Sequence, residues 1–253
     1  MILSVEKAIG ILSLFSFSQP RWGISEIAKA MGLPKGTTHN LVSTLTSAGF
    51  LQQDPETRRY SLGPKLFTLG SIMVGTLEIN QKASAPAHRL AEQTGLICRV
   101  AIWDTDAALI TLNVSRQDTE ATAARIGPRV AAYCSALGRA LLAHLDPPLL
   151  EAYLRELKPV AYTPRTLVTK AKIKKEILET RARGYARNNQ ELAPARASLA
   201  VPLFQGGGAL AASISLTGGE SDLFGERQPP LVEALLKTAA EISRYMGFYP
   251  SLV

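Results

Sequence analysis

The chain has 253 residues, of which 46% are hydrophobic and 19% charged, and its formal net charge is +7. It is long enough for one large or two smaller globular domains, and its two cysteines exclude a disulfide-stapled miniprotein. No apolar run approaches the length of a membrane span, and MILSVEKAIG lacks the features of a signal peptide. We therefore expect a reducing cytoplasm and no membrane contact, and the positive charge favours a polyanionic partner.

Two amphipathic helices are expected near the amino terminus. Five apolar side chains at helical spacing in the first are expected to close a small core: Val5, Ala8, Ile9, Leu12 and Phe15. The second is expected to begin with Ser25 as its cap and Glu26 in its first turn, where a negative charge suits the positive helix end. Gly32 is expected to end it. Its apolar stripe comprises Ile27, Ala28 and Met31.

A third helix follows directly. Pro34 suits its first turn and Gly49 ends it. The inward stripe is expected to comprise Thr37, Thr38, Leu41, Leu45 and Ala48. The opposite face is small or polar and contains Lys35, Gly36, His39, Asn40 and Ser43. A face of this composition can enter the major groove of DNA and contact base edges and phosphates.

A β-hairpin completes this region, with strands expected over 50–53 and 59–62 and turn residues at 54–57. Arg58 and Arg59 are placed on its second strand, where a wing would touch the phosphate backbone. Helix, turn, helix and hairpin form the layout of a winged helix-turn-helix, which places one helix in the major groove. The alternatives are a piece of another α+β domain, or a protein-interaction module whose polar helix face is merely solvated.

The rest of the chain mixes helices and strands. Gly63 and Pro64 break the hairpin, and a linker helix is expected to carry Leu66, Leu69, Ile72 and Met73 at helical spacing. Later helices are expected over 79–92, 135–145, 170–183 and 230–247, the last burying Val232, Leu235, Leu236, Ala239 and Ile242. Strands are expected over 97–103, 108–114, 185–189, 196–204 and 209–217.

Because these elements do not alternate strictly, they predict an α+β protein with a largely antiparallel sheet flanked by helices. We expect three regions: a winged helix-turn-helix over 1–63, a linker helix over 64–78 and a ligand-binding domain over 79–253.

The last two strands are joined by a glycine-rich loop, which allows their residues to be paired. With a four-residue loop, Arg196 opposes Thr217, Ser198 opposes Ser215 and Ala200 opposes Ser213, all on one face. The other face is apolar and is expected to be the core: Leu199, Val201, Leu210, Ala212, Ile214 and Leu216. The polar face is either a solvated outer surface or a site for a small anion. In the second case Arg196 would clamp a carboxylate, and Ser198, Ser215 and Thr217 would supply hydrogen bonds.

Several stretches resemble the IclR family of bacterial transcriptional regulators. The amino-terminal domain of that family is similar to SVEKAIGILSLF followed by ISEIAKAMGLPKGTTHNLVSTLTSAGFLQQDPETRRYSLGPKLFTLG, and CSALGRALLAHL, RARGYARNNQELAPARASLAVPLF and ISLTGG also match. The resemblance implies a winged helix-turn-helix and a GAF-like effector-binding domain. It also implies a ligand-responsive regulator, such as a repressor, that acts as a homodimer or dimer of dimers on double-stranded operator DNA.

The resemblance also implies the residues of two sites. The expected DNA-binding residues are Lys35, Gly36, Thr37, Thr38, His39, Asn40, Arg58 and Arg59. The expected effector-binding residues are Cys134, Ser135, Ala136, Leu137, Asn188, Arg196, Ser198, Ser215 and Thr217. Several relatives sense small organic or aromatic acids, so an acid of this class is the expected effector.

Four positions depart from the family pattern. Asn40 replaces a usual arginine, and because asparagine suits adenine, we hypothesise an altered operator preference. Asn188 stands where an aspartate is common, which leaves Arg196 without a compensating charge and favours an anionic effector. Ala195 replaces a usual glycine and Ser198 a frequent cysteine.

A hydrolase of a small amide or ester is the alternative function, with Ser198 or Cys134 as nucleophile. No partner base can be identified for either residue. Cys98, Cys134, His88 and His144 do not have the spacing of metal ligands, so neither a metal nor another cofactor is expected.

Overall fold

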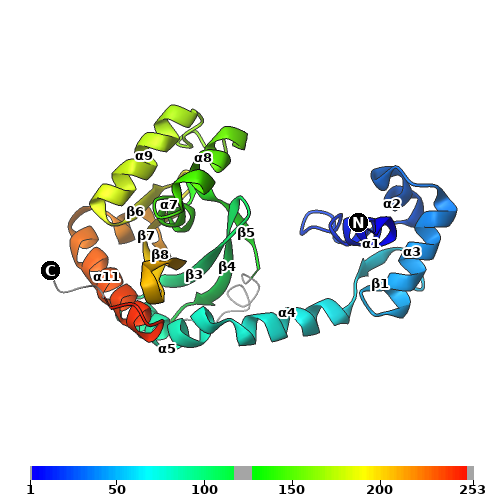
Figure 1. Cartoon of the computed structure of the whole chain (residues 1–253), viewed down its shortest axis with the longest axis horizontal. Coiled ribbons are helices and arrows are strands. Elements are labelled where there is room, and N and C mark those ends of the chain that lie inside the picture. Colours follow the sequence, from blue (N-terminus) through cyan, green and yellow to red (C-terminus); the bar gives the residue numbers. More distant parts are fainter. Residues whose placement is uncertain (1, 117–126, 250–253) are drawn as a thin grey trace. The chain divides into compact units, whose positions relative to one another are not determined.

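The computed structural model describes residues 2–116 and 127–249 (Figure 1). The chain divides into two compact units, Met1–Thr76 and Leu77–Val253, called here the N-terminal and C-terminal units. Gly127, the first described residue of the second range, adopts a positive φ of 98°. No helix among the described residues is both long and apolar enough to cross a membrane.

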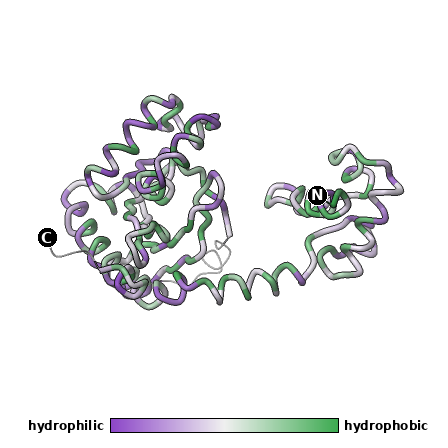
Figure 2. Tube along the Cα trace, viewed as in Figure 1, coloured by the Kyte–Doolittle hydropathy of each residue, from purple (hydrophilic) through white to green (hydrophobic). Residues whose placement is uncertain are grey.

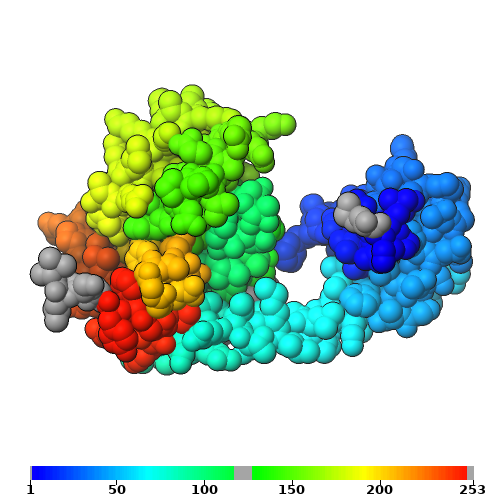
Figure 3. Space-filling model, in the orientation of Figure 1, coloured from blue at the N-terminus to red at the C-terminus, as the bar shows by residue number. Residues whose placement is uncertain are grey.

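The N-terminal unit is a winged helix-turn-helix followed by a helix. Its elements are α1 (Leu3–Leu12), α2 (Ile24–Met31), α3 (Lys35–Ser47), β1 (Leu51–Gln53), β2 (Tyr60–Leu62) and α4 (Pro64–Thr76). A small core joins the three helices to the hairpin through Ile11, Ile27, Val42, Leu45, Leu51 and Tyr60. By contrast, α4 buries none of its residues and exposes Phe67, Leu69, Ile72 and Met73 on the surface drawn in cyan in Figure 3.

Three details of the N-terminal helices differ from the sequence prediction. In α1 the fully buried residue is Ile11, whereas Val5 and Ile9 are 52% and 58% exposed. Ala8, Leu12 and Phe15 pack against the core as predicted, so Val5 and Ile9 are the predicted residues that do not, and Ile11 is the buried residue that was not predicted. The cap of α2 is Gly23 rather than Ser25, because the Glu26 carboxylate accepts the Gly23 N–H at 2.8 Å.

The inward face of α3 is also rotated relative to the prediction. Val42 is fully buried, together with Thr38 and Leu45, whereas Thr37 and Ala48 lie on the surface. The small apolar Val42 therefore fills the position next to the predicted stripe. As a consequence, Thr37 joins the outward polar face.

The C-terminal unit is built on one six-stranded antiparallel sheet in the order β5-β4-β3-β8-β7-β6. The strands are β3 (Ile97–Asp104), β4 (Ala107–Val114), β5 (Arg129–Ala131), β6 (Ala186–Asn189), β7 (Ala197–Phe204) and β8 (Leu210–Gly218). The longer helices are α5 (Glu78–Thr94), α7 (Ala136–Leu142), α8 (Pro147–Glu156), α9 (Lys170–Arg183) and α11 (Gln228–Tyr245). A short helix, α10 (Glu220–Leu223), follows β8. The predicted α+β class and antiparallel sheet are confirmed.

Each face of the sheet is covered by helices (Figure 1). Helices α5 and α11 pack on one face through a core that includes Leu90, Leu199, Ile214 and Leu235. Helix α7 packs on the other face, and α8 and α9 extend that layer through a second cluster. The hydropathy colouring is accordingly green along much of the sheet and more often purple on α9, whose outer side is charged (Figure 2).

The helix α8 was missed by the sequence reading. Pro147 and Pro148, which follow the end of the preceding helix, occupy the first turn of α8, where a backbone N–H has no partner within the helix. In α11 the predicted residues Leu235, Ala239 and Ile242 are buried, whereas Leu236 is 44% exposed and Leu231 is buried without having been predicted.

The register between β7 and β8 differs from the predicted one by two residues. Ser198 opposes Thr217 and Ala200 opposes Ser215, and Arg196 lies before β7 instead of opposite Thr217. One residue of the shift comes from a longer loop and one from a bulge beside Phe204. Two shifts of one residue leave each side chain on its predicted face. Leu210, which lies beyond the bulge, packs on the α7 side instead of in the predicted core.

Candidate functional site

The outward face of α3 carries the polar residues expected to contact DNA. Lys35, Thr37, His39 and Asn40 are all exposed, and a side chain at Gly36 would meet no atom within 4 Å. Thr38 is different, because it is fully buried and its hydroxyl donates to the Pro34 carbonyl at 3.1 Å. Thr38 therefore holds the first turn of the helix, while its neighbours form the accessible face.

The two arginines of the wing lie just before β2 and not on it, which corrects their predicted position. Arg58 adopts a positive φ of 57° and its N–H donates to the Asp54 carbonyl, which closes the turn. The Arg59 guanidinium donates to Glu26 at 2.6 Å and to the Arg21 carbonyl at 3.2 Å. Arg59 thus fastens the wing to α2, and Arg58 is the wing cation without a described ion pair.

A cavity of about 190 Å³ lies in the C-terminal unit, between the α7 side of the sheet and the start of α7. Its lining includes eight of the nine residues predicted to bind an effector: Ser135, Ala136, Leu137, Asn188, Arg196, Ser198, Ser215 and Thr217. The structure also adds Arg99, Ile110, Val130, Leu192, Ala193 and Ala197. An apolar cavity of roughly 150 Å³ accommodates benzene, so this volume suits a molecule with a single ring or a short chain.

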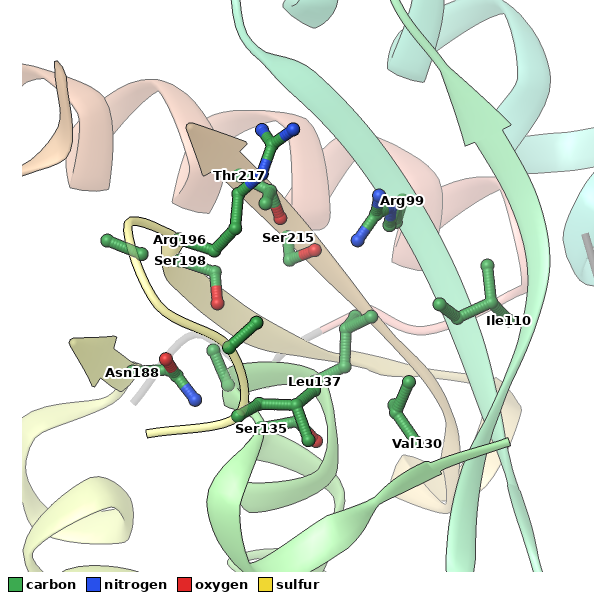
Figure 4. A pocket seen from close by; sticks show the side chains of 14 residues that line it. Arg99, Ile110, Val130, Ser135, Leu137, Asn188, Arg196, Ser198, Ser215 and Thr217 are labelled. Carbon is green, nitrogen blue, oxygen red and sulfur yellow. The ribbon is translucent and has the colours of Figure 1, made fainter. Parts of the chain in front are cut away.

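The cavity has a cationic end and an apolar end (Figure 4). Arg99 and Arg196 lie near Thr217 at one end, whereas Ile110 and Val130 lie at the other. Arg196 is exposed and forms no ion pair with a described carboxylate, and the described lining contains no Asp or Glu. The arrangement can therefore receive an anionic group at one end and an apolar group at the other.

The Asn188 amide connects two parts of the cavity wall. It is buried, its Nδ2 donates to the Cys134 carbonyl, and its Oδ1 accepts the Glu191 N–H at 3.3 Å. An aspartate could accept from Glu191 but, when ionised, could not donate to the carbonyl. The asparagine that departs from the family pattern therefore matches its hydrogen-bonding surroundings.

The Ser215 hydroxyl is buried on the polar sheet face. Ser215 is 1% exposed, and its Oγ has no hydrogen-bond partner among the described residues. Leaving a buried hydroxyl unpaired costs roughly 1–3 kcal/mol. A ligand polar group that reached this hydroxyl would supply the missing partner.

Cys134 is the one predicted effector residue that does not line the cavity. Its side chain packs in the cluster between η1 (Ala132–Cys134) and α8, and its Sγ lies 3.8 Å from the Ala131 carbonyl. Ser135 instead caps α7, since its hydroxyl accepts the Gly138 N–H at 3.1 Å. The backbone of Cys134 takes part in the wall through Asn188, but its thiol does not.

The sequence did not predict that Arg99 lines the cavity, because its position there depends on the pairing of two strands that are distant in the sequence. Strands were predicted over 97–103 and 108–114, but the contact of β3 with β8, which sets Arg99 opposite Ser215, was not predicted. The signal in the sequence was a charged residue within the apolar strand ICRVAIW. Arg99 is held in place by its Nε, which donates to Asn113 at 2.8 Å.

The geometry does not assemble a hydrolytic site. Burial raises the pKa of the Cys134 thiol to about 12, so it is protonated at neutral pH. Ser198 lines the cavity, but the described lining has no histidine or carboxylate to act as its base.

Comparisons with known proteins cover both units. The model described as "Bacterial transcriptional regulator IclR C-terminal" matches residues 72–244, and the one described as "IclR helix-turn-helix domain" matches residues 4–55. The chain is 31% identical to the HTH-type transcriptional regulator XynR of Escherichia coli K12, over 98% of each chain.

Solved structures give the same result for the fold. An IclR transcriptional regulator from Alicyclobacillus acidocaldarius is 29% identical, with a TM-score of 0.82 over 98% of this chain and 100% of that chain. An IclR homolog from Microbacterium hydrocarbonoxydans, complexed with 4-hydroxybenzoate, shares the fold at 21% identity. Its TM-score is 0.79 over 96% of this chain and 99% of that chain.

Proposed function

The chain belongs to the IclR family of bacterial transcriptional regulators, and from this premise we propose that it senses a small organic acid. The family consists of regulators that bind DNA and small-molecule effectors, and not of enzymes. The acid would occupy the cavity beside α7, with its carboxylate toward Arg196 and its apolar part toward Ile110 and Val130.

The observation that carries this proposal is the charge of the cavity lining. Arg196 reaches the cavity without a described counter-ion, and no described lining residue is acidic. A guanidinium can bind both oxygens of a carboxylate, so it favours an acid over the corresponding amide. The 4-hydroxybenzoate bound to the Microbacterium homolog is an acid of this class and of a size that suits the cavity.

A thermal-shift screen of paired carboxylic acids and their amides tests the proposal. A ligand that prefers the native state raises the melting temperature, so the acids are expected to raise it and the amides are not. Arg196→Ala is expected to abolish the shift, whereas the control Arg155→Ala, which removes an exposed arginine of α8, is expected to retain it. Equal shifts for acids and amides, or shifts that persist in Arg196→Ala, would overturn the carboxylate clamp.

We further propose that the outward face of α3 reads the operator. Lys35 and Arg58 would serve phosphates, and His39 and Asn40 would reach base edges near Gly36 and Thr37. Asn40→Arg, compared with wild type on a set of operator variants, tests the role of the asparagine. We expect a loss of preference for adenine at one position, and an unchanged preference would end this idea.

A homodimer, or a dimer of dimers, is the proposed assembly. The exposed apolar side chains of α4 and the exposed Val5 and Ile9 of α1 support contact with a second copy. Two protomers would place two α3 helices on a near-palindromic operator. The double substitution Phe67→Glu with Ile72→Glu is expected to lower the sedimenting mass, and an unchanged mass would remove α4 from the interface.

A further inference from the structure

One wall of the cavity is an irregular segment, residues 190–196, that carries Leu192, Ala193 and Arg196. Two of its residues that are not glycine have positive φ, namely Gln190 at 61° and Ala195 at 56°. Such conformations are uncommon and persist when surrounding contacts impose them. The segment therefore requires anchors elsewhere in the fold.

The strongest anchor is a buried ion pair. Arg139, on α7, is 1% exposed and binds the Glu191 carboxylate through both terminal nitrogens, one of them at 2.6 Å. The same guanidinium donates to the carbonyls of Tyr133 and Arg187, both at 2.9 Å. The guanidinium therefore donates to three separate parts of the chain. Among its three partners, only the Glu191 carboxylate carries a negative charge.

Neutral hydrogen bonds hold the backbone around Glu191. The hydroxyls of Thr163 and Thr166 donate to the carbonyls of Gln190 and Glu191, at 2.7 and 2.6 Å. The Gln190 N–H donates to the Arg196 carbonyl at 2.9 Å and closes the segment on itself.

The ion pair joins the two walls of the cavity. Its arginine belongs to α7, whose cap and first turn supply Ser135 and Leu137 (Figure 4), and its carboxylate belongs to the segment that supplies Leu192 and Arg196. Glu191 itself does not line the cavity, so it can act on a ligand only through its neighbours.

We propose that Glu191 is a positioning residue for effector binding. Paired with Arg139, it fixes residues 190–196 in the conformation that presents Leu192 and Arg196 to the ligand. The proposal rests on the proposed function of the cavity, and it assigns a role in that function to a residue that does not line the cavity.

Glu191→Gln tests the proposal because it retains the shape of the side chain and removes its charge. We expect amide hydrogen exchange at residues 190–196 to accelerate at least tenfold in the ligand-free full-length protein. The matched control is Glu176→Gln, which removes the half-buried pair with Arg183 in the same unit. That control is expected to change exchange at 190–196 by less than twofold.

A double variant separates positioning from stability, because Glu191→Gln alone leaves the Arg139 charge buried without a partner. Replacing a whole buried pair with well-packed hydrophobic side chains of similar volume is often close to neutral for stability. Arg139→Met with Glu191→Met is therefore expected to regain most of the lost melting temperature. Its dissociation constant for 4-hydroxybenzoate is nevertheless expected to stay at least tenfold above the wild-type value.

Two results would overturn the positioning role. One is unchanged exchange at residues 190–196 in Glu191→Gln, and the other is a double variant that regains both the melting temperature and the affinity. If the wild-type protein binds no acid, the proposed function fails separately. Because hydrogen exchange is measured on the ligand-free protein, it decides in either case whether Glu191 fixes the conformation of residues 190–196.

Discussion

The outward face of α3 and the cavity beside α7 are constructed in contrasting ways. The α3 face consists of exposed side chains from consecutive residues of one helix, and Thr38 alone turns inward to hold the first turn. The cavity gathers residues from six strands, one helix and an irregular segment, between Arg99 and Thr217. Its walls are joined by buried groups such as Arg139 and Asn188.

Because of this difference, substitutions in the two regions are expected to have different effects on ligand or DNA affinity and on stability. A substitution on the α3 face removes an exposed group, so it is expected to change DNA affinity with little effect on folding. A substitution in the cavity wall also breaks buried hydrogen bonds or packing, so it is expected to change ligand affinity and stability together. Four predictions test this contrast.

The largest expected effect is that of Gly138→Ala. A Cβ at this position would lie 2.2 Å from the Ala132 Cα and 2.5 Å from its carbonyl oxygen, so the backbone of α7 would have to move. We expect the C-terminal unit to lose about 3 kcal/mol of its free energy of unfolding. Urea unfolding followed by Trp103 fluorescence in a Trp22→Phe background measures this loss.

Gly36→Ala is the matched control on the α3 face, where the added methyl group would meet no atom within 4 Å. Alanine is favoured over glycine inside a helix by roughly 0.5–1 kcal/mol, so this variant is expected to be slightly more stable. A similar loss of stability in both variants would contradict the contrast between the two regions.

The second prediction concerns Asn188→Asp. The carboxylate would face the Cys134 carbonyl without a proton to donate, and its charge would lie in the same cavity lining as Arg196. We expect a loss of roughly 1–3 kcal/mol in stability and about tenfold weaker binding of 4-hydroxybenzoate. Calorimetric titration and thermal melts provide the two measurements.

Asn188→Ala separates charge from hydrogen bonding, because it loses both hydrogen bonds of the amide, including the one from Glu191 that an aspartate could keep, and adds no negative charge. It is expected to lose stability but to bind the acid better than Asn188→Asp does. Equal acid affinity in the wild type and Asn188→Asp would show that the charge of this position does not matter.

The sequence predicted most of the secondary structure because local patterns determine it. Gly32, Gly95 and Gly184 end their helices in the left-handed conformation, and α9 has its predicted bounds. The individual residues predicted wrongly in α1, α3 and α11 lie where neighbouring apolar side chains offered two choices of similar quality, such as Leu231 and Leu236 in α11. Packing against the rest of the unit decided between them.

The cavity could be predicted only in part. The polar face of β7 and β8 was identified correctly because the loop and the bulge each shifted the register by one residue. Arg99 depends on the pairing of β3 with β8, and Leu192 on an irregular segment, and neither leaves a periodic signal in the sequence. Long-range contacts, rather than residue types, therefore limited the prediction.

The third prediction concerns the exposed cation at the start of α3. Lys35→Ala is expected to weaken operator binding by about tenfold and to reduce the slope of log affinity against log salt by roughly one, as for the loss of one phosphate contact. The melting temperature is expected to stay the same. The control Lys172→Ala removes an exposed lysine of α9 and should leave the salt slope unchanged. A change in melting temperature without a change in the salt slope would show that Lys35 contributes to folding and not to DNA binding.

The smallest expected effect is the pH dependence contributed by Glu26, which connects α2 to the wing. The Gly23 N–H, followed by the Arg59 guanidinium, lowers the pKa of this carboxyl below its ordinary value of 4.5. A lowered pKa in the folded state means that the stabilisation is complete above the unfolded value and is lost as the pH falls through the folded value. Melts of the full chain between pH 6 and 3 (roughly the range of carboxyl titration), followed by Trp22 fluorescence in a Trp103→Phe background, should show this loss in the N-terminal unit.

In Glu26→Gln the acid-dependent decline should be shallower, because the titrating group is absent while the amide oxygen can still accept the Gly23 N–H. If both proteins declined equally, other carboxylates such as Asp54, whose pKa the Thr57 N–H lowers most, would account for the acid sensitivity of the wing.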